Sequence, residues 1–194
     1  MKTANMLTLL RIILAPVFFV VYRISGGRGI VPAFFHPGLW VAVLWVIFIV
    51  SELTDMFDGM AARRLGETSD FGRLFDPFAD TLTQLSFFLC FVIDGILPAF
   101  LYLAVLYREF GILFVRNLML RKGVTLGARM AGKIKTVAYI AAAAFALLIA
   151  SFRRLGALDP ANPGALGFAC TGLFAVSVVL AYVSFADYIR IYRE

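Results

Sequence analysis

The chain has 194 residues, 62% of them hydrophobic, a net charge of +6 and a mean hydropathy of +0.91. A soluble domain is closer to half apolar, and here the excess lies in long apolar runs. This composition excludes an ordinary soluble enzyme and predicts an all-α, polytopic membrane protein. Cys90 and Cys170 both lie inside apolar runs, so we expect two buried thiols and no disulfide.

Six apolar runs are expected to form transmembrane helices, in chain order 7–24, 39–57, 74–96, 98–120, 133–151 and 165–188. No small-residue cleavage site follows the first run, which favours a retained span over a signal peptide. The connections are short, and Ile96-Leu97-Pro98 is typical of a tight turn. We therefore expect one six-helix bundle that forms a single domain over residues 1–194. His36 precedes Pro37 in a loop and is expected to be a surface residue.

The positive charges predict how this bundle is oriented. With both termini in the cytoplasm, 13 of the 18 Lys and Arg residues lie inside, four lie outside, and Arg108 falls within a span. Such a bias is typical of the cytoplasmic side of a membrane protein. Attraction to anionic headgroups, together with orientation, accounts for part of the net charge, and we expect membrane lipid, and no nucleic acid, as a partner.

Four aspartates lie near the ends of the second and third runs. The helical pattern of the second run continues through Asp55 and Asp58 to Arg63, beyond its apolar part. Asp55 and Asp58 are spaced i,i+3, and Asp76 and Asp80 are spaced i,i+4, so each pair shares one helix face. Carboxylates beside lipid need a compensating partner, and hard divalent cations select oxygen ligands. Facing helix ends would suit two divalent ions about 3.5–4 Å apart in a cytoplasm-facing cavity.

The segment between the two aspartate pairs is expected to be a loop from Gly66 to Gly72, with the next helix beginning near Arg73. Pro77 would then lie in the first helical turn, where its missing N–H matters little. Gly59 and Gly72 would leave room for a ligand to approach the backbone.

The pattern D-x2-D-G-x2-A-R-x8-G-x3-D-x3-D, from Asp55 to Asp80, resembles the signature of the CDP-alcohol phosphotransferase family, and every fixed position matches. The six-span layout extends the resemblance over most of the chain. It implies a CDP-linked donor and two divalent cations, Mg²⁺ or Mn²⁺. By resemblance, one ion is held by Asp55, Asp58 and Asp76, and the other by Asp55, Asp76 and Asp80. Asp80 would also be the general base. The CDP pocket would be formed by Asp55, Asp58, Gly59, Ala62, Arg63, Gly72 and Asp76.

A second set of residues is basic and lies in the fourth run and near the start of the fifth: Arg108, Arg116, Arg129, Lys133 and Lys135. Arg108 and Arg116 are eight residues apart, so both can share one helix face. Beside a cavity, these cations would bind a phosphate-bearing acceptor alcohol. The alternative for Lys133 and Lys135 is that they anchor the helix at the membrane interface. Glu109 is adjacent to Arg108, hence expected on a different face and not as its partner.

Three segments, 5–12, 108–112 and 132–136, resemble the bacterial phosphatidylglycerophosphate synthase branch of the family. That branch transfers a phosphatidyl group from CDP-diacylglycerol to sn-glycerol 3-phosphate and releases CMP. The resemblance implies a bacterial cytoplasmic membrane and makes Asn5, Thr8 and Arg11 candidate nucleotide or lipid contacts. Ala4 replaces the branch's usual proline, and Thr81 replaces a common basic residue. The second departure leaves the identity of the acceptor open.

Other functions are compatible with parts of this pattern. The same chemistry could use inositol phosphate or serine as acceptor, or a CDP-amino-alcohol donor with diacylglycerol. A divalent-cation transporter would place its acids near the bilayer midplane, whereas here they gather toward the cytoplasmic end. Members of the family tend to be homodimers. The large side chains Phe87, Phe88, Phe91 and Tyr102 could face lipid or a second copy.

Overall fold

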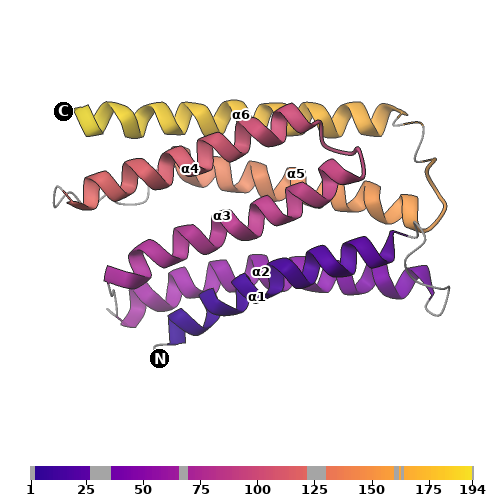
Figure 1. Ribbon diagram of the computed structural model, residues 1–194, viewed down its shortest axis with the longest axis horizontal. Coiled ribbons are helices and arrows are strands. Elements are labelled where there is room, and N and C mark those ends of the chain that lie inside the picture. Colours follow the sequence, from indigo (N-terminus) through magenta and orange to yellow (C-terminus); the bar gives the residue numbers. More distant parts are fainter. Residues whose placement is uncertain are drawn as a thin grey trace. The chain divides into compact units, whose positions relative to one another are not determined.

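Every secondary-structure element in the described part of the computed structural model is an α-helix (Figure 1). The structure describes residues 3–26, 36–65, 70–121, 130–159, 162 and 164–193, with side chains described outside 3–7, 55–74, 120–121, 130–131, 191 and 193. The helices are α1 (Thr3–Ser25), α2 (Pro37–Leu65), α3 (Asp70–Ile93), α4 (Ala99–Arg121), α5 (Met130–Arg154) and α6 (Gly164–Arg193). The prediction of an all-α protein is confirmed.

Length and composition show which of these helices can cross a membrane. Among the described residues, four helices are long and apolar enough, namely α1, α2, α5 and α6. The α3 helix carries Asp76 and Asp80, and α4 carries part of the basic set; these polar side chains lower the apolar character of both helices. Several apolar helices support a multi-pass membrane protein, while the count of six spans stays a prediction.

The α2 and α3 helices extend further than their apolar runs. The α2 helix continues to Leu65, which confirms the predicted extension past Asp55 and Asp58 to Arg63. The α3 helix begins at Asp70 and not near Arg73, so the predicted loop to Gly72 is too long. An acidic residue at a helix start is favoured by the helix dipole. Pro77 consequently lies inside α3 and not in its first turn, where it removes one hydrogen bond of the helix.

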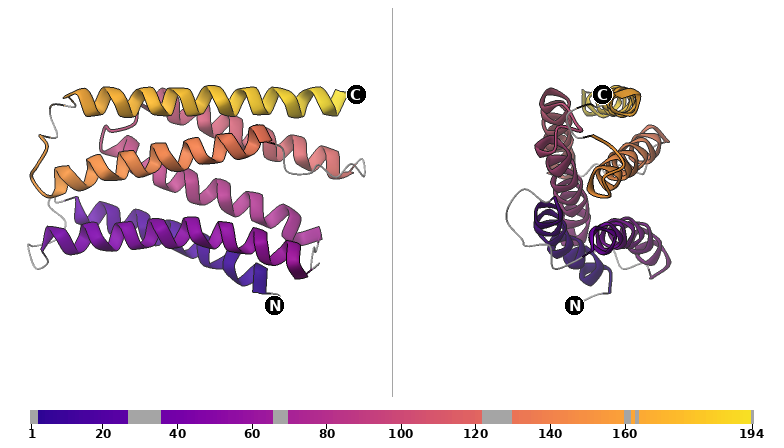
Figure 2. Two further views of the ribbon diagram at one scale, coloured as in Figure 1. Left: turned by 180° about the vertical axis from the view of Figure 1, so that it is seen from behind. Right: turned by 90° about the vertical axis from the view of Figure 1, so that its right-hand side faces the viewer.

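The described contacts divide the chain into two compact units, and the first comprises Met1–Cys90 with Ala150–Pro160. Its core is aromatic: Phe87 of α3 lies 4.3 Å from Phe18 of α1 and 5.5 Å from Phe48 of α2 between ring centroids. Figure 1 and the reverse view in Figure 2 show α1 and α3 running in the same direction and α2 in the opposite one. Three helices therefore meet around one buried ring.

The prediction that the phenylalanines of α3 face lipid or a second copy is wrong. The exposed fractions of Phe87 and Phe88 are 1%, and that of Phe91 is 0%. These rings lie on the face that α3 turns toward its own chain, because burial of aromatic rings is a large part of the packing energy of a small bundle. Tyr102 of α4 is partly exposed.

Within the first unit, Arg154 connects the end of α5 to the end of α1. Its Nη2 donates to the carbonyl oxygen of Tyr22 (2.9 Å), its Nε donates to the hydroxyl of Ser25 (3.0 Å), and its Nη1 donates to the carbonyl oxygen of Ala150 (3.0 Å). The guanidinium also lies 4.0 Å from the ring centroid of Tyr22. A cation at two helix C-termini is favoured by both helix dipoles. Arg154 thus ties the last turn of α1 to the last turn of α5.

The second unit comprises Phe91–Ile149 with Ala161–Glu194. Here α5 buries small residues, Ala142, Ala143 and Ala146, which let a neighbouring helix approach closely. The hydroxyl of Ser177 in α6 donates to the carbonyl oxygen of Ala138 (3.1 Å). The expectation of one domain over residues 1–194 stays a prediction.

Smaller expectations about turns and surface residues are confirmed. After α3, the N–H groups of Ile96 and Leu97 both donate to the carbonyl oxygen of Phe91 (2.8 and 3.1 Å), and Gly95 has a φ of 67°. This is the predicted tight turn, and its positive φ favours glycine. His36 is exposed. Cys90 and Cys170 are both buried, and neither forms a disulfide.

Candidate active site

Two contacts hold the carboxylates of α3 against α1. The hydroxyl of Thr8 donates to Asp76 Oδ1 at 2.6 Å, and the guanidinium of Arg11 forms an ion pair with Asp80 Oδ1. Thr8 and Arg11 are one turn apart on α1, and Asp76 and Asp80 are one turn apart on α3. Because the two helices run in the same direction, the pairs form successive contacts along one helix–helix boundary.

The Arg11–Asp80 pair is buried on one side and open on the other. The side chain of Arg11 is 2% exposed, whereas that of Asp80 is 45% exposed. Thr83 on the next turn of α3 adds a weak contact, its hydroxyl donating to the carbonyl oxygen of Arg11 at 3.5 Å. A carboxylate that is fixed from the inside and accessible from the outside can accept a proton or a cation without reorienting.

The remaining residues of the aspartate motif lie on helical backbone at the same end of the first unit. Asp55, Asp58, Gly59, Ala62 and Arg63 all belong to the last three turns of α2, and Gly72 belongs to the first turn of α3. Their side chains, and that of Asn5 in α1, are outside the described residues. Four residues separate Leu65 from Asp70, so the end of α2 and the start of α3 are close, as Figures 1 and 2 show. Chain connectivity therefore brings the two aspartate pairs to one end of this unit.

The donor chemistry of this region suits hard divalent cations. Carboxylate oxygens are the ligands that Mg²⁺ and Mn²⁺ select. The donors from α1 each engage one oxygen, Oδ1, of Asp76 and Asp80, and so fix how the carboxylates are presented. Among described side chains there is no group of three or more possible metal ligands, since only two of the four aspartates are included. The described half of the motif thus fits the expected cations.

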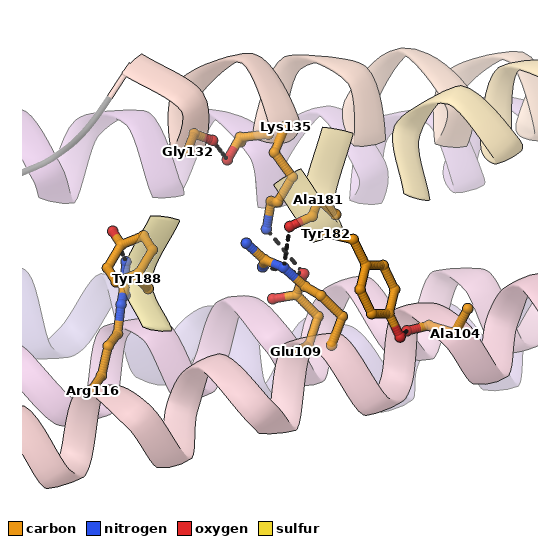
Figure 3. Close-up of polar contacts among 10 residues, drawn as sticks. Ala104, Glu109, Arg116, Gly132, Lys135, Ala181, Tyr182 and Tyr188 are labelled. Atoms are coloured by element: carbon orange, nitrogen blue, oxygen red, sulfur yellow. Dashed lines mark hydrogen bonds and ion pairs between the residues drawn. The ribbon is translucent and has the colours of Figure 1, made fainter. Parts of the chain in front are cut away.

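Two of the basic residues, Arg108 and Lys135, meet at a buried glutamate in the second unit (Figure 3). Glu109 Oε1 accepts from Arg108 Nη1 at 2.7 Å and from Lys135 Nζ at 3.1 Å. Arg108 Nε donates to the carbonyl oxygen of Ala181 in α6 at 3.0 Å. We name Arg108, Glu109 and Lys135 the α4–α5 triad.

The expectation that Glu109 is not the partner of Arg108 is therefore wrong. Adjacent helical residues project about 100° apart, but both side chains are long enough to meet beside the helix. The interior also favours their pairing, because a buried charge is costly unless a counter-charge lies beside it. Sequence reasoning missed Glu109; its signal was an acidic residue inside an apolar run that contains an arginine.

The other basic residues take different positions. Arg116 Nη2 donates to the hydroxyl of Tyr188 in α6 at 3.3 Å, and its guanidinium carbon lies 5.5 Å from the centroid of that ring. The ammonium of Lys135 lies 4.7 Å from the ring centroid of Tyr139. Lys133 is exposed, whereas Arg129 is outside the described residues. Of the predicted acceptor residues, Arg108 and Lys135 are thus brought together, and Arg116 lies two turns along α4.

Comparisons with known proteins show the family of the chain. The model of the CDP-alcohol phosphatidyltransferase family matches residues 1–185. A Treponema pallidum protein named CDP-diacylglycerol–glycerol-3-phosphate 3-phosphatidyltransferase is 38% identical over 98% of this chain and 88% of its own length. A Mycobacterium tuberculosis protein named probable phosphatidylglycerophosphate synthase is 31% identical over 96% of this chain and 79% of its own. A Bacillus subtilis protein with the same name as the first is 32% identical over 74% of this chain and 75% of its own. The chain belongs to the CDP-alcohol phosphatidyltransferase family, as its aspartate motif predicted.

Proposed function

We propose that this protein transfers a phosphatidyl group from CDP-diacylglycerol to sn-glycerol 3-phosphate and releases CMP, a step of phospholipid biosynthesis. The observation that carries the proposal is the 38% identity, over 98% of the chain, to a relative named for this activity. The complete aspartate motif supports it, because a transferase of this kind must bind a diphosphate.

The donor would bind at the cytoplasmic ends of α2 and α3. Asp55, Asp58, Asp76 and Asp80 would hold two divalent cations, Mg²⁺ or Mn²⁺. When bound, such ions neutralise the diphosphate and make CMP a better leaving group. The pocket for cytidine and diphosphate would be completed by Gly59, Ala62, Arg63 and Gly72.

Asp80 is the proposed general base for the hydroxyl of the acceptor. A general base must come within hydrogen-bond reach of the proton that it removes. The 45% exposure of the Asp80 side chain supports this access, and the ion pair with Arg11 keeps the carboxylate in one orientation. Thr8 plays the corresponding part for Asp76, so α1 contributes to the site by positioning residues.

The acceptor's phosphate would be bound by cations of the second unit. The α4–α5 triad has two cations and one anion, so it carries one excess positive charge, and Arg116 adds another. Lys133 is an exposed candidate near the start of α5. A phosphomonoester fits such cations, and so does inositol phosphate, whereas serine has no phosphate to bind. If the donor were a CDP-amino-alcohol, the acceptor would be diacylglycerol. Diacylglycerol is uncharged and has no phosphate for these cations to bind. Membership of a transferase family leaves the cation transporter without support.

The proposal includes the setting of the enzyme. We place it in the bacterial cytoplasmic membrane as six spans of a single domain, with both termini and the site's opening on the cytoplasmic side. The distribution of Lys and Arg supports this orientation. We also propose a homodimer, because members of the family tend to be homodimers.

Purified protein supplied with CDP-diacylglycerol and one acceptor at a time tests the reaction through release of CMP. We expect product with sn-glycerol 3-phosphate, loss of turnover after chelation, and recovery with Mg²⁺ or Mn²⁺. Asp80→Asn should lower turnover by about 100-fold or more, because general-base catalysis contributes roughly 10²–10⁴-fold. Asp159→Asn, in the exposed segment after α5, is the matched control. Product with inositol phosphate or serine, but none with glycerol 3-phosphate, would overturn the acceptor; full turnover by Asp80→Asn would remove the base.

A further inference from the structure

Glu109 occupies a position that the proposed transfer reaction does not by itself require. Its side chain is 5% exposed, and a single oxygen, Oε1, accepts from cations of two different helices. Arg108 comes from α4 beside it, and Lys135 comes from the first turns of α5. The Nε of Arg108 is at the same time fixed by the carbonyl oxygen of Ala181 in α6. One carboxylate thus organises donors within a three-helix junction.

The α4–α5 triad places two cations beside one anion. Arg108 is 4% exposed and the Lys135 side chain is 13% exposed, so both cations are largely withdrawn from water. An excess buried charge attracts a counter-ion strongly, because water screens it little. Within the described part of the chain, the second terminal nitrogen of Arg108, Nη2, donates to no protein acceptor. An anion can therefore be bound here by donors that are already in place.

We propose that Glu109 is a positioning residue, which orients Arg108 and Lys135 so that both donate to the phosphate of the acceptor. This inference rests on the proposed function. The ammonium of a lysine is a mobile point charge on four methylene groups, and one short contact to Glu109 restricts it. The guanidinium is held twice, by Glu109 and by Ala181. Restricting these donors in advance removes ordering entropy that phosphate binding would otherwise cost.

A carboxylate beside a phosphate site has two opposed effects on the affinity for phosphate. As a charge alone, Glu109 repels a phosphate, so its neutralisation would tighten binding. As a positioning residue, Glu109 strengthens the phosphate contacts of its two partners, so its neutralisation weakens binding. Glu109→Gln preserves size and one acceptor oxygen while it removes the charge. We expect the Kd for sn-glycerol 3-phosphate to rise about tenfold, the usual scale for weakening a charge-assisted hydrogen bond.

The test uses the full-length protein in lipid nanodiscs and two separate measurements. Calorimetric titration with sn-glycerol 3-phosphate, without donor, gives the Kd independently of turnover. Steady-state CMP release then gives the KM of each substrate. For Glu109→Gln, the KM for glycerol 3-phosphate should rise with the Kd, while the KM for CDP-diacylglycerol stays within about twofold. Tyr182→Phe is the control, since it removes another α4–α6 hydrogen bond, to the carbonyl oxygen of Ala104 (3.1 Å), outside the triad.

A double-mutant cycle shows whether Glu109 acts through Lys135. We expect Glu109→Gln with Lys135→Gln to be little weaker in binding than Lys135→Gln alone, because the residue to be positioned is already lost. The double variant also keeps the net charge of the protein, so it provides a measurement if Glu109→Gln does not fold. If Glu109→Gln does not fold, Glu109→Asp replaces it as the single variant that is compared with the wild type. Glu109→Asp keeps the charge on a shorter side chain and should weaken binding of glycerol 3-phosphate severalfold.

The outcomes distinguish this inference from the function on which it rests. If the wild type neither binds glycerol 3-phosphate nor releases CMP with it, the proposed function fails. If the wild type does both, and Glu109→Gln binds equally well or more tightly, Glu109 is not a positioning residue. Equal increases in the KM values of both substrates would also overturn the inference, since they indicate general damage to the fold. Additive effects in the cycle would exclude Lys135 as the residue through which Glu109 acts.

Discussion

Thr8 is a small residue that contacts a carboxylate of the candidate active site. It is fully buried, and its hydroxyl donates to Asp76 at 2.6 Å, the shorter range of hydrogen bonds to a carboxylate. A hydroxyl in an apolar helix is usually bonded to its own backbone. Here it crosses to α3, and it thereby fixes one of the proposed metal ligands from outside the motif.

Thr8→Val tests the hydrogen bond to Asp76, because valine has nearly the same shape as threonine but no hydroxyl. The variant should need about tenfold more Mg²⁺ for half-maximal turnover, because residues that orient metal ligands typically change metal affinity by roughly 10–100-fold. Titration of activity against Mg²⁺ gives the value. Thr8→Ser keeps the hydroxyl and serves as the control. An unchanged Mg²⁺ requirement in Thr8→Val would mean that the hydrogen bond from Thr8 does not affect metal binding by Asp76.

At the scale of single residues, the sequence predicted the candidate site residues better than it predicted which side chains contact them. The spacing of the aspartates identified Asp76 and Asp80, because a helix period links spacing to a shared face. The partners Thr8 and Arg11 lie almost 70 residues away in sequence, and no local period connects them to the aspartates. The pairing of Arg108 with Glu109 was missed for another reason, since side-chain length outweighed the helix angle.

The α4 and α6 helices form a boundary in which polar and apolar contacts alternate. Tyr182 bonds to Ala104, Arg108 bonds to Ala181, and Arg116 bonds to Tyr188. Between them lies Gly111, where a Cβ atom would come within 2.9 Å of Cζ of Phe185. The absence of a side chain at Gly111 therefore permits the ring of Phe185 to lie against the α4 backbone.

Gly111→Ala should destabilise this boundary. Despite the better helix propensity of alanine, its methyl group must displace the ring of Phe185, and overpacking of this kind costs about 1–3 kcal/mol. We expect a lower Tm for detergent-solubilised protein. Gly172→Ala is the matched control, because a Cβ atom there meets nothing within 4 Å. A Tm equal to that of Gly172→Ala would show that the ring of Phe185 moves aside at no cost.

The helices themselves were largely predictable from the sequence, and their ends were less so. Apolar runs located all the described helices because burial or lipid contact selects apolar side chains over whole spans. The start of α3 was missed, since Asp70, Gly72 and Pro77 resemble turn residues when they are read locally. In the folded chain these residues continue the helix, and tertiary contacts of the kind seen at Asp76 and Asp80 outweigh weak local preferences.

At the scale of the whole molecule, the even number of predicted spans places both termini on one side. Leu155, just after α5, is 51% exposed, and Lys133, near the start of α5, is also exposed. These positions lie at opposite ends of a helix that is long enough to cross the membrane. They can therefore report the orientation of the protein.

Labelling of single cysteines tests that orientation. In a background with Cys90→Ala and Cys170→Ala, Leu155→Cys should react with a membrane-impermeant maleimide in intact cells. Lys133→Cys should react only after the membrane is permeabilised. The proposed cytoplasmic site requires this pattern, because CDP-linked donors and phosphorylated alcohols are found in the cytoplasm. The reverse pattern would place the aspartates on the wrong side for such substrates.

Arg154 has a consequence for how the protein is made. The first unit takes in the segment Ala150–Pro160, although its other residues all precede Phe91. A ribosome therefore completes the aspartate motif well before it adds the arginine that fastens α1 to the end of α5. Until that residue leaves the exit tunnel, α1 packs against α3 through Thr8, Arg11 and Phe18 but lacks the hydrogen bonds that hold its last turn. A chain cut short before the end of the fifth helix would lack these hydrogen bonds to Tyr22 and Ser25.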